Sequence, residues 1–162
     1  MSTMTKYDFK AKATDAISKA RTFYLDDLAA LSEDQLLKSP GGCARTPADF
    51  TYELVVINRR ITMRLKGQDP GPYPFEGWIT APAEYTNKEA IIRDFDSSTK
   101  ELEEALAAIP EDEMLRTIQL PNDTTTPYDL VTFCATHIGY HDAQLNFLQT
   151  LHDDKEVHWK FD

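Results

Sequence analysis

Two histidines that stand four residues apart, His137 and His141, are the most chemically suggestive feature of this sequence. They lie in a segment that begins Thr126-Pro127, a helix-capping residue followed by a proline at the first helical position. Side chains four apart on a helix project from one face, so both imidazoles point the same way. Periodicity predicts that this face is buried, and its members are Leu130, Phe133, Cys134, His137, His141, Gln144, Leu148 and Leu151. Buried imidazoles need polar partners, and a metal ion is one partner that takes both.

A carboxylate occupies a comparable position on a second predicted helix, residues 47–66. Glu53 falls within about one residue's rotation of the apolar stripe of that helix. The stripe consists of Phe50, Leu54, Ile57, Ile61 and Leu65. A carboxylate on a core face is costly unless it is paired or coordinated. Arg60 and Arg64 flank the stripe, so an internal salt bridge is one interpretation, and metal coordination is the other.

Two imidazoles and one carboxylate form a recognised type of metal site. If Glu53 faces His137 and His141, the set suits a divalent transition metal such as Zn, Ni, Fe or Mn. Three protein ligands leave coordination positions open for water or substrate, and open sites are typical of catalysis. Each residue also has a structural interpretation, since an inward pair of histidines can be hydrogen-bonded in a core or at a dimer interface.

Composition narrows the classes of function. The chain has 162 residues and a net charge of −10, which favours one domain (1–162) and disfavours binding to nucleic acid or to an anionic membrane surface. No apolar run approaches the ~20 residues of a membrane span. The N-terminal residues show no secretory pattern, and the only cysteines are Cys43 and Cys134. We therefore expect a cytoplasmic protein without a disulfide framework.

Four segments show helical periodicity, and no long alternating segment indicates a sheet. The predicted helices cover about residues 5–31, 47–66, 87–109 and 127–152. Each begins with a threonine that is followed three residues later by an acid, at Thr5, Thr46, Thr86 and Thr126. The prediction is an all-α four-helix bundle. Its connections are roughly fifteen to twenty residues long, well beyond the ~2–8 of simple bundles, so we expect at least one crossover connection.

The second connection, residues 67–85, contains the aromatic residues Tyr73, Phe75 and Trp78. Aromatic side chains in a loop are seldom left wholly exposed. They can pack on the bundle as a lid over the core, or they can line the mouth of a functional pocket. The sequence leaves both interpretations open.

These segments resemble the DinB-like (DinB/YfiT) superfamily of metal-binding four-helix bundles over about residues 5–152. The strongest match is T-P-Y-D-L…H-I-G-Y-H-D-A-Q-L-N-F-L, from Thr126 to Leu148, which is similar to the family's last helix. A weaker match is T-P-A-D-F-T-Y-E-L-V-V-I-N-R-R-I, from Thr46 to Ile61. The resemblance implies crossover connections and a divalent metal held by three histidines, one on the second helix and two on the last.

The sequence departs from this pattern at one ligand. His137 and His141 match the pair on the last helix, whereas Glu53 stands where the first histidine is normally found. A Glu/His/His site still binds metal, but its extra negative charge reduces the Lewis acidity of the ion. The alternative is a member that has lost its metal because Glu53 replaces the usual histidine.

The resemblance also implies a range of functions. Characterised members of the superfamily include thiol-dependent transferases and isomerases that use low-molecular-weight thiols. We therefore expect a metal-dependent thiol transferase or hydrolase that acts on a small electrophilic substrate, in a chain that can form a homodimer. The alternative is a metal-free protein that binds a small ligand, or acts in a stress response, on the same scaffold.

Overall fold

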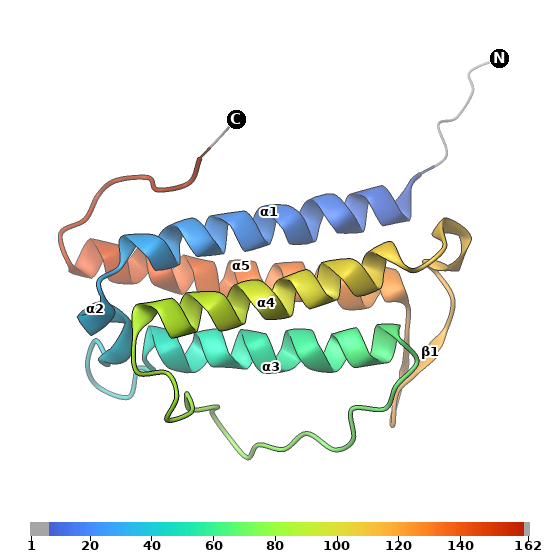
Figure 1. Cartoon of the computed structure of the whole chain (residues 1–162), viewed down its shortest axis with the longest axis horizontal. Coiled ribbons are helices and arrows are strands. Elements are labelled where there is room, and N and C mark those ends of the chain that lie inside the picture. Colours follow the sequence, from blue (N-terminus) through green and yellow to red (C-terminus); the bar gives the residue numbers. More distant parts are fainter. Residues whose placement is uncertain (1–6, 161–162) are drawn as a thin grey trace.

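The computed structural model describes residues 7–160, which fold into helices and one short hairpin. The elements are α1 (Phe9–Ala30), α2 (Glu33–Leu37), α3 (Pro47–Leu65), α4 (Lys88–Ala107), the 3-10 turn η1 (Glu111–Glu113), β1 (Ile118–Gln119), β2 (Thr124–Thr125) and α5 (Pro127–Leu151). The four long helices α1, α3, α4 and α5 lie side by side (Figure 1). The predicted all-α four-helix bundle is confirmed.

The two helices that carry the candidate ligands begin as predicted. At α3, Thr46 Oγ1 accepts from the Asp49 backbone N–H at 3.0 Å, and an Asp49 carboxylate oxygen accepts from the Thr46 N–H at 2.9 Å. At α5, Thr126 Oγ1 accepts from the Asp129 N–H at 3.1 Å. Both helices have proline at their first position. These caps satisfy N–H groups that an isolated helix end leaves unpaired, and so they fix where each ligand-bearing helix begins.

The other two starts differ from the prediction. Asp8 caps α1 by accepting from the Ala11 N–H, so the helix begins at Phe9, and the predicted start at Thr5 lies outside the described residues. Asn87, rather than Thr86, caps α4. Asp and Asn are as effective at this position as Thr, so the threonine-to-acid spacing alone did not discriminate between neighbouring candidates.

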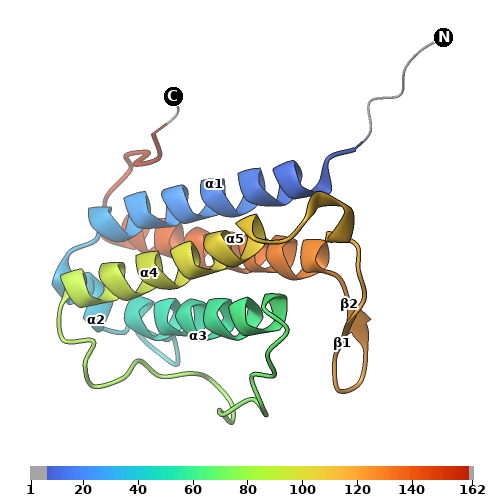
Figure 2. The ribbon, with the colours of Figure 1, turned by 45° about the vertical axis from the view of Figure 1, so that its right-hand side comes forward.

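Besides the 3-10 turn η1, one short helix and one hairpin were not predicted. Ser32 and Gln35 form a capping box that starts α2, a helix of five residues between α1 and α3. The antiparallel pair β1–β2 lies between η1 and α5 and pairs Ile118 with Thr125 and Gln119 with Thr124 (Figure 2). Neither element is long enough to show a clear hydrophobic period.

The helices form two parallel pairs. α1 and α5 run in one direction, and α3 and α4 run in the opposite direction (Figure 1). α1 packs on α5 and α4, while α3 packs on α4 and α5, so consecutive long helices α1 and α3 occupy opposite corners. Because α3 and α4 are parallel, residues 66–87 must return along the length of the bundle. The predicted crossover is this connection.

The crossover is fastened to α3 along its course. Asp49 Oδ1 accepts from the Ala81 N–H at 2.8 Å, near the start of the helix. Farther along, the Arg60 guanidinium donates to the carbonyls of residues 70, 71 and 72 at 2.7–3.2 Å. Ile79 is buried. These contacts hold the connection beside the face of α3 from which Glu53 projects.

The core follows the predicted stripes of the long helices. Its fully buried side chains include Ile17, Tyr24, Leu28, Leu54, Phe95, Leu102, Leu106 and Ile138. Buried polar groups on different helices pair with each other, as in the 2.7 Å bond between Tyr24 Oη and Thr51 Oγ1. Within residues 7–160, none of the helices combines the length with the apolar composition that a membrane span would need.

Candidate metal centre

The packing of α3 against α5 brings together all three residues that the sequence singled out. Glu53 lies in the second turn of α3, and His137 and His141 lie on consecutive turns of α5. Glu53 Oε1 is 3.1 Å from His137 Nε2 and 3.5 Å from His141 Nε2. The two Nε2 atoms are 3.2 Å apart. One potential ligand atom from each residue lies within 4.8 Å of the others, so the group could hold a metal ion.

The spacing of these atoms fits a divalent transition metal. Ligand atoms bound at ~2.0–2.1 Å around a tetrahedral ion lie ~3.3 Å from one another. The observed separations of 3.1, 3.2 and 3.5 Å are close to that edge length. A point about 2 Å from all three atoms is therefore geometrically available between α3 and α5.

The hydrogen-bond pattern also leaves lone pairs directed at this point. His141 Nδ1 lies 2.7 Å from Gln144 Oε1, which can only accept, so Nδ1 carries the proton of the neutral ring. The Nε2 of His141 is then unprotonated and faces both the carboxylate oxygen of Glu53 and the Nε2 of His137. If Nε2 of His137 carries a proton, this one N–H faces two acceptors, Glu53 Oε1 and His141 Nε2, and cannot point at both. A metal cation can bind all three atoms at once.

Neighbouring side chains hold the candidate ligands in place. The Arg45 guanidinium pairs with Glu53 Oε2, which leaves Oε1 directed at the imidazoles. Phe50 stacks on the ring of His141 at 5.0 Å between centroids, with an angle of 5° between planes. His137 stacks on Phe133 at 5.7 Å, but its buried Nδ1 has no hydrogen-bond partner among the described residues. A side chain outside the candidate ligands therefore hydrogen-bonds His141 and Glu53, whereas His137 hydrogen-bonds only within the Glu/His/His group and is otherwise held by packing.

The electrostatic environment favours the ligating protonation states. Burial lowers the pKa of His141 to about 4, and burial also lowers the pKa of His137, although its bond to Glu53 opposes the change. Burial alone would raise the pKa of Glu53, but the hydrogen bond and charge of Arg45, together with both histidines, keep it below its ordinary value. At neutral pH the group therefore consists of two neutral imidazoles and one carboxylate, which are the forms that bind metals.

The low pKa of His141 predicts a pH-dependent stability. The unfolded chain takes up a proton near pH 6.5, whereas the folded chain resists protonation of His141 down to about pH 4. The free energy of unfolding therefore decreases by up to about 3 kcal/mol as the pH falls through this window.

Urea titrations of the metal-stripped protein between pH 7 and pH 4 will measure this decrease. The His141→Gln variant should lose less stability over this range than the parent. The control His152→Gln, at an exposed position, should lose as much stability as the parent. Parallel curves for parent and His141→Gln would contradict this prediction.

Sequence reasoning missed the residue that pairs with Glu53. The predicted partners were Arg60 and Arg64, but Arg60 binds the crossover and the actual partner is Arg45. Arg45 precedes the cap of α3, eight residues from Glu53, so no helical period relates the two. A basic residue just before the Thr46 cap was the only available signal.

The predicted buried stripe of α5 is also rotated from the observed one. Phe133 and Leu151 were placed in the core but are 52% and 55% exposed. The fully buried face is centred instead on Val131, Cys134, Ile138, Leu145 and the imidazole of His141. The difference arises because α5 packs mainly on α1 and less on α3, so the ligand face lies at the edge of the core. His137, whose side chain is 14% exposed, lies at that edge.

The aromatic residues of the crossover lie beside the candidate centre. Trp78 lies over the Arg45 guanidinium at 4.5 Å and is itself 74% exposed. Tyr73 contacts the Arg60 guanidinium at 5.5 Å, and its ring lies near Phe75. Burial first, and the charge of Glu53 second, raise the pKa of Tyr73. Of the two interpretations left open by the sequence, this arrangement favours residues that border a site over a lid that only covers the core.

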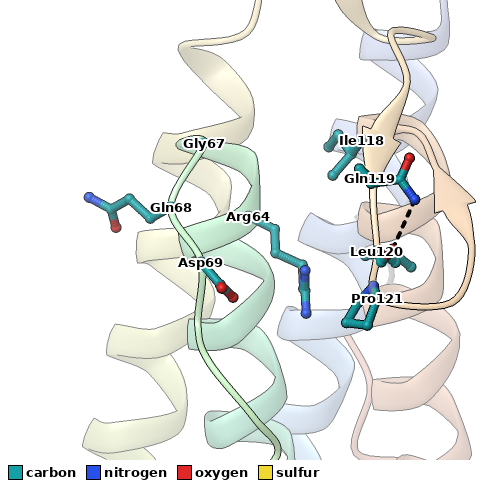
Figure 3. Close-up of a pocket in the computed structure, with 8 residues that line it drawn as sticks. All are labelled: Arg64, Gly67, Gln68, Asp69, Ile118, Gln119, Leu120 and Pro121. Atoms are coloured by element: carbon teal, nitrogen blue, oxygen red, sulfur yellow. Dashed lines mark hydrogen bonds between the residues drawn. The ribbon is translucent and has the colours of Figure 1, made fainter.

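A hollow of about 410 Å³ lies at the C-terminal end of α3, next to the hairpin. Figure 3 shows the Arg64 side chain lying between the start of the crossover and residues 118–121 of the hairpin. Arg64 is eleven residues beyond Glu53, or about 16 Å along the helix axis. This hollow holds no histidine or cysteine among its lining residues and is separate from the Glu/His/His group.

Comparison with known proteins agrees with this architecture. Residues 16–145 match the family model of the DinB superfamily, and the chain therefore belongs to that superfamily. Among solved structures, a conserved protein from Enterococcus faecalis is similar, with a TM-score of 0.68 and 14% sequence identity. The alignment covers 87% of this chain and 95% of the other. At this identity the likeness concerns the fold. No curated protein matches the sequence.

Proposed function

We propose that the chain is a divalent-metal-dependent enzyme in which Glu53, His137 and His141 hold the ion. The observation that carries the proposal is the convergence of three ligand atoms from α3 and α5 at separations of 3.1–3.5 Å. Membership of the DinB superfamily supports the same assignment. We further propose that the reaction is thiol transfer, or hydrolysis, on a small electrophile.

The surrounding residues suit an open, Lewis-acidic centre. A bound divalent ion would supply Lewis acidity, which lowers the pKa of a thiol or water that it coordinates. Glu53 adds a negative charge relative to a three-histidine site, but the positive charge of Arg45 on Oε2 offsets it. Arg45 and Gln144 position the carboxylate and the imidazole, and Phe50 shields the ring of His141 from water.

A metal-free ligand-binding protein is the second candidate. One observation favours it, because Arg45 and His137 already satisfy both carboxylate oxygens of Glu53 without a cation. Elemental analysis of protein purified without a histidine tag separates the two. We expect about one Zn, Ni, Fe or Mn ion per chain, or uptake to that level on addition. A content below about 0.2 ion per chain after metal addition would favour the second candidate.

A further inference from the structure

A small hollow of about 190 Å³ lies next to the candidate metal centre. Its lining residues come from the segment before α3, from α3 and from the last turns of α5, and they are Pro40, Ala44, Arg45, Phe50, Gln144, Phe147, Leu148 and Leu151. Six of these side chains are apolar. An apolar cavity of ~150 Å³ is large enough for benzene, so this hollow suits one ring or a short aliphatic chain.

Three of the lining residues also contact the candidate ligands. Arg45 pairs with Glu53, Gln144 accepts from His141, and Phe50 stacks on His141. The polar end of the hollow is therefore the end nearest the candidate metal. A molecule bound in the hollow would place its apolar part against Phe147 and Leu151 and its head group near the centre.

The polar groups at that end offer hydrogen-bond donors. Gln144 Oε1 is occupied by His141 Nδ1, so the remaining function of this side chain is its amide NH₂, which has no partner among residues 7–160. Arg45 can only donate, and just one of its nitrogens, Nη1, bonds to Glu53. The Arg45 side chain is 15% exposed, and its other nitrogens have no hydrogen-bond partner within the described part of the chain.

We propose that this hollow is a binding site for small apolar monocarboxylates, with the carboxylate between Arg45 and Gln144 and the hydrocarbon part against Phe147 and Leu151. Two donors without a free acceptor select an anionic head group over an ammonium or a hydroxyl, and a guanidinium matches the planar geometry of a carboxylate. The inference rests on the proposed function in one respect: it assigns the chemical class of the small molecule that would lie beside the metal centre.

Calorimetric titration of the full chain tests the proposal with three probes of equal length, namely hexanoate, 1-hexanol and hexylammonium. We expect hexanoate to bind at least about tenfold more tightly than the other two, because a charge-assisted pair replaces a neutral contact or a repulsion. The preference should persist in protein stripped of metal with a chelator. Equal affinity for hexanoate and hexanol, or hexanoate binding only to the metal-loaded protein, would overturn the proposal.

The Gln144→Glu variant tests whether the amide of Gln144 helps to bind the carboxylate. The carboxylate retains an oxygen that accepts from His141 Nδ1, but it replaces the amide donor with a negative charge in the hollow. Hexanoate affinity should fall by about tenfold or more. Gln68→Glu, an exposed position at the start of the crossover, is the control for the change in net charge and should bind hexanoate as the parent does. Unchanged hexanoate binding by Gln144→Glu would contradict the assignment.

Metal content measured on the same samples separates this inference from the proposed function. Metal uptake with no preference for hexanoate would refute the carboxylate site and leave the metal centre intact. Conversely, a hexanoate preference that Gln144→Glu abolishes, in a chain that takes up no metal, would support the carboxylate site and refute the proposed metalloenzyme.

Discussion

Replacement of His141 by alanine is expected to weaken binding of a divalent transition metal by at least about a hundredfold. Of the two candidate imidazoles, His141 is the fully buried one, and residues outside the candidate ligands orient it, because Gln144 accepts from its Nδ1 and Phe50 stacks on its ring. Its loss leaves a carboxylate and one histidine, which cannot hold an ion with comparable affinity. Competition titration with a chromophoric chelator will measure the dissociation constant.

The His152→Ala variant is the matched control. His152 is exposed at the C-terminal end of α5, about 16 Å along the helix from His141. The His152→Ala variant should bind metal with the affinity of the parent. If His141→Ala retained stoichiometric, tight binding while remaining folded, the ligand assignment would be wrong.

Replacement of Glu53 by alanine is expected to reduce both metal affinity and stability. The change removes one candidate ligand and leaves Arg45 as a largely buried charge without its carboxylate. Removal of one partner of a buried ion pair is strongly destabilising, here by about 3 kcal/mol. Chemical denaturation of the metal-stripped protein will give the change in the free energy of unfolding, and the chelator competition will give the change in affinity.

Two further variants distinguish these effects. Adding Arg45→Met to Glu53→Ala should recover much of the lost stability, because no unpaired charge remains, but it should not restore metal binding. Glu53→His should preserve or strengthen metal binding because it supplies a third imidazole. As a control, Glu101→Ala breaks a surface pair with Arg59 and should cost no more than about 1 kcal/mol. A Glu53→Ala variant as stable as the parent would show that the pair with Arg45 contributes little.

The sequence was sufficient to predict the four long helices and the faces on which the candidate ligands lie, because both depend on local patterns. Apolar periodicity located the four long helices, and Thr46 and Thr126 located the starts of α3 and α5 to the residue. The helix period placed His137 and His141 on one face, and α3 presents Glu53 to them. Only the family resemblance, which the match to the DinB superfamily confirms, suggested that the two helices are adjacent.

The support around the centre could not be predicted, because it depends on how separate elements pack. Arg45 reaches Glu53 from the loop before α3, and Trp78 reaches Arg45 from the crossover. No spacing in the sequence relates these residues. The rotation of α5 toward α1, which exposes Phe133 and Leu151, likewise results from the unequal packing of α5 on its two neighbours.

The most direct test of the central claim is an anomalous difference map from crystals of the metal-loaded protein, collected at the absorption edge of the metal. A single strong peak between α3 and α5, about 2 Å from Glu53 Oε1, His137 Nε2 and His141 Nε2, is the predicted result. A peak bound by other residues, or a map without a peak between these helices, would contradict the metal centre.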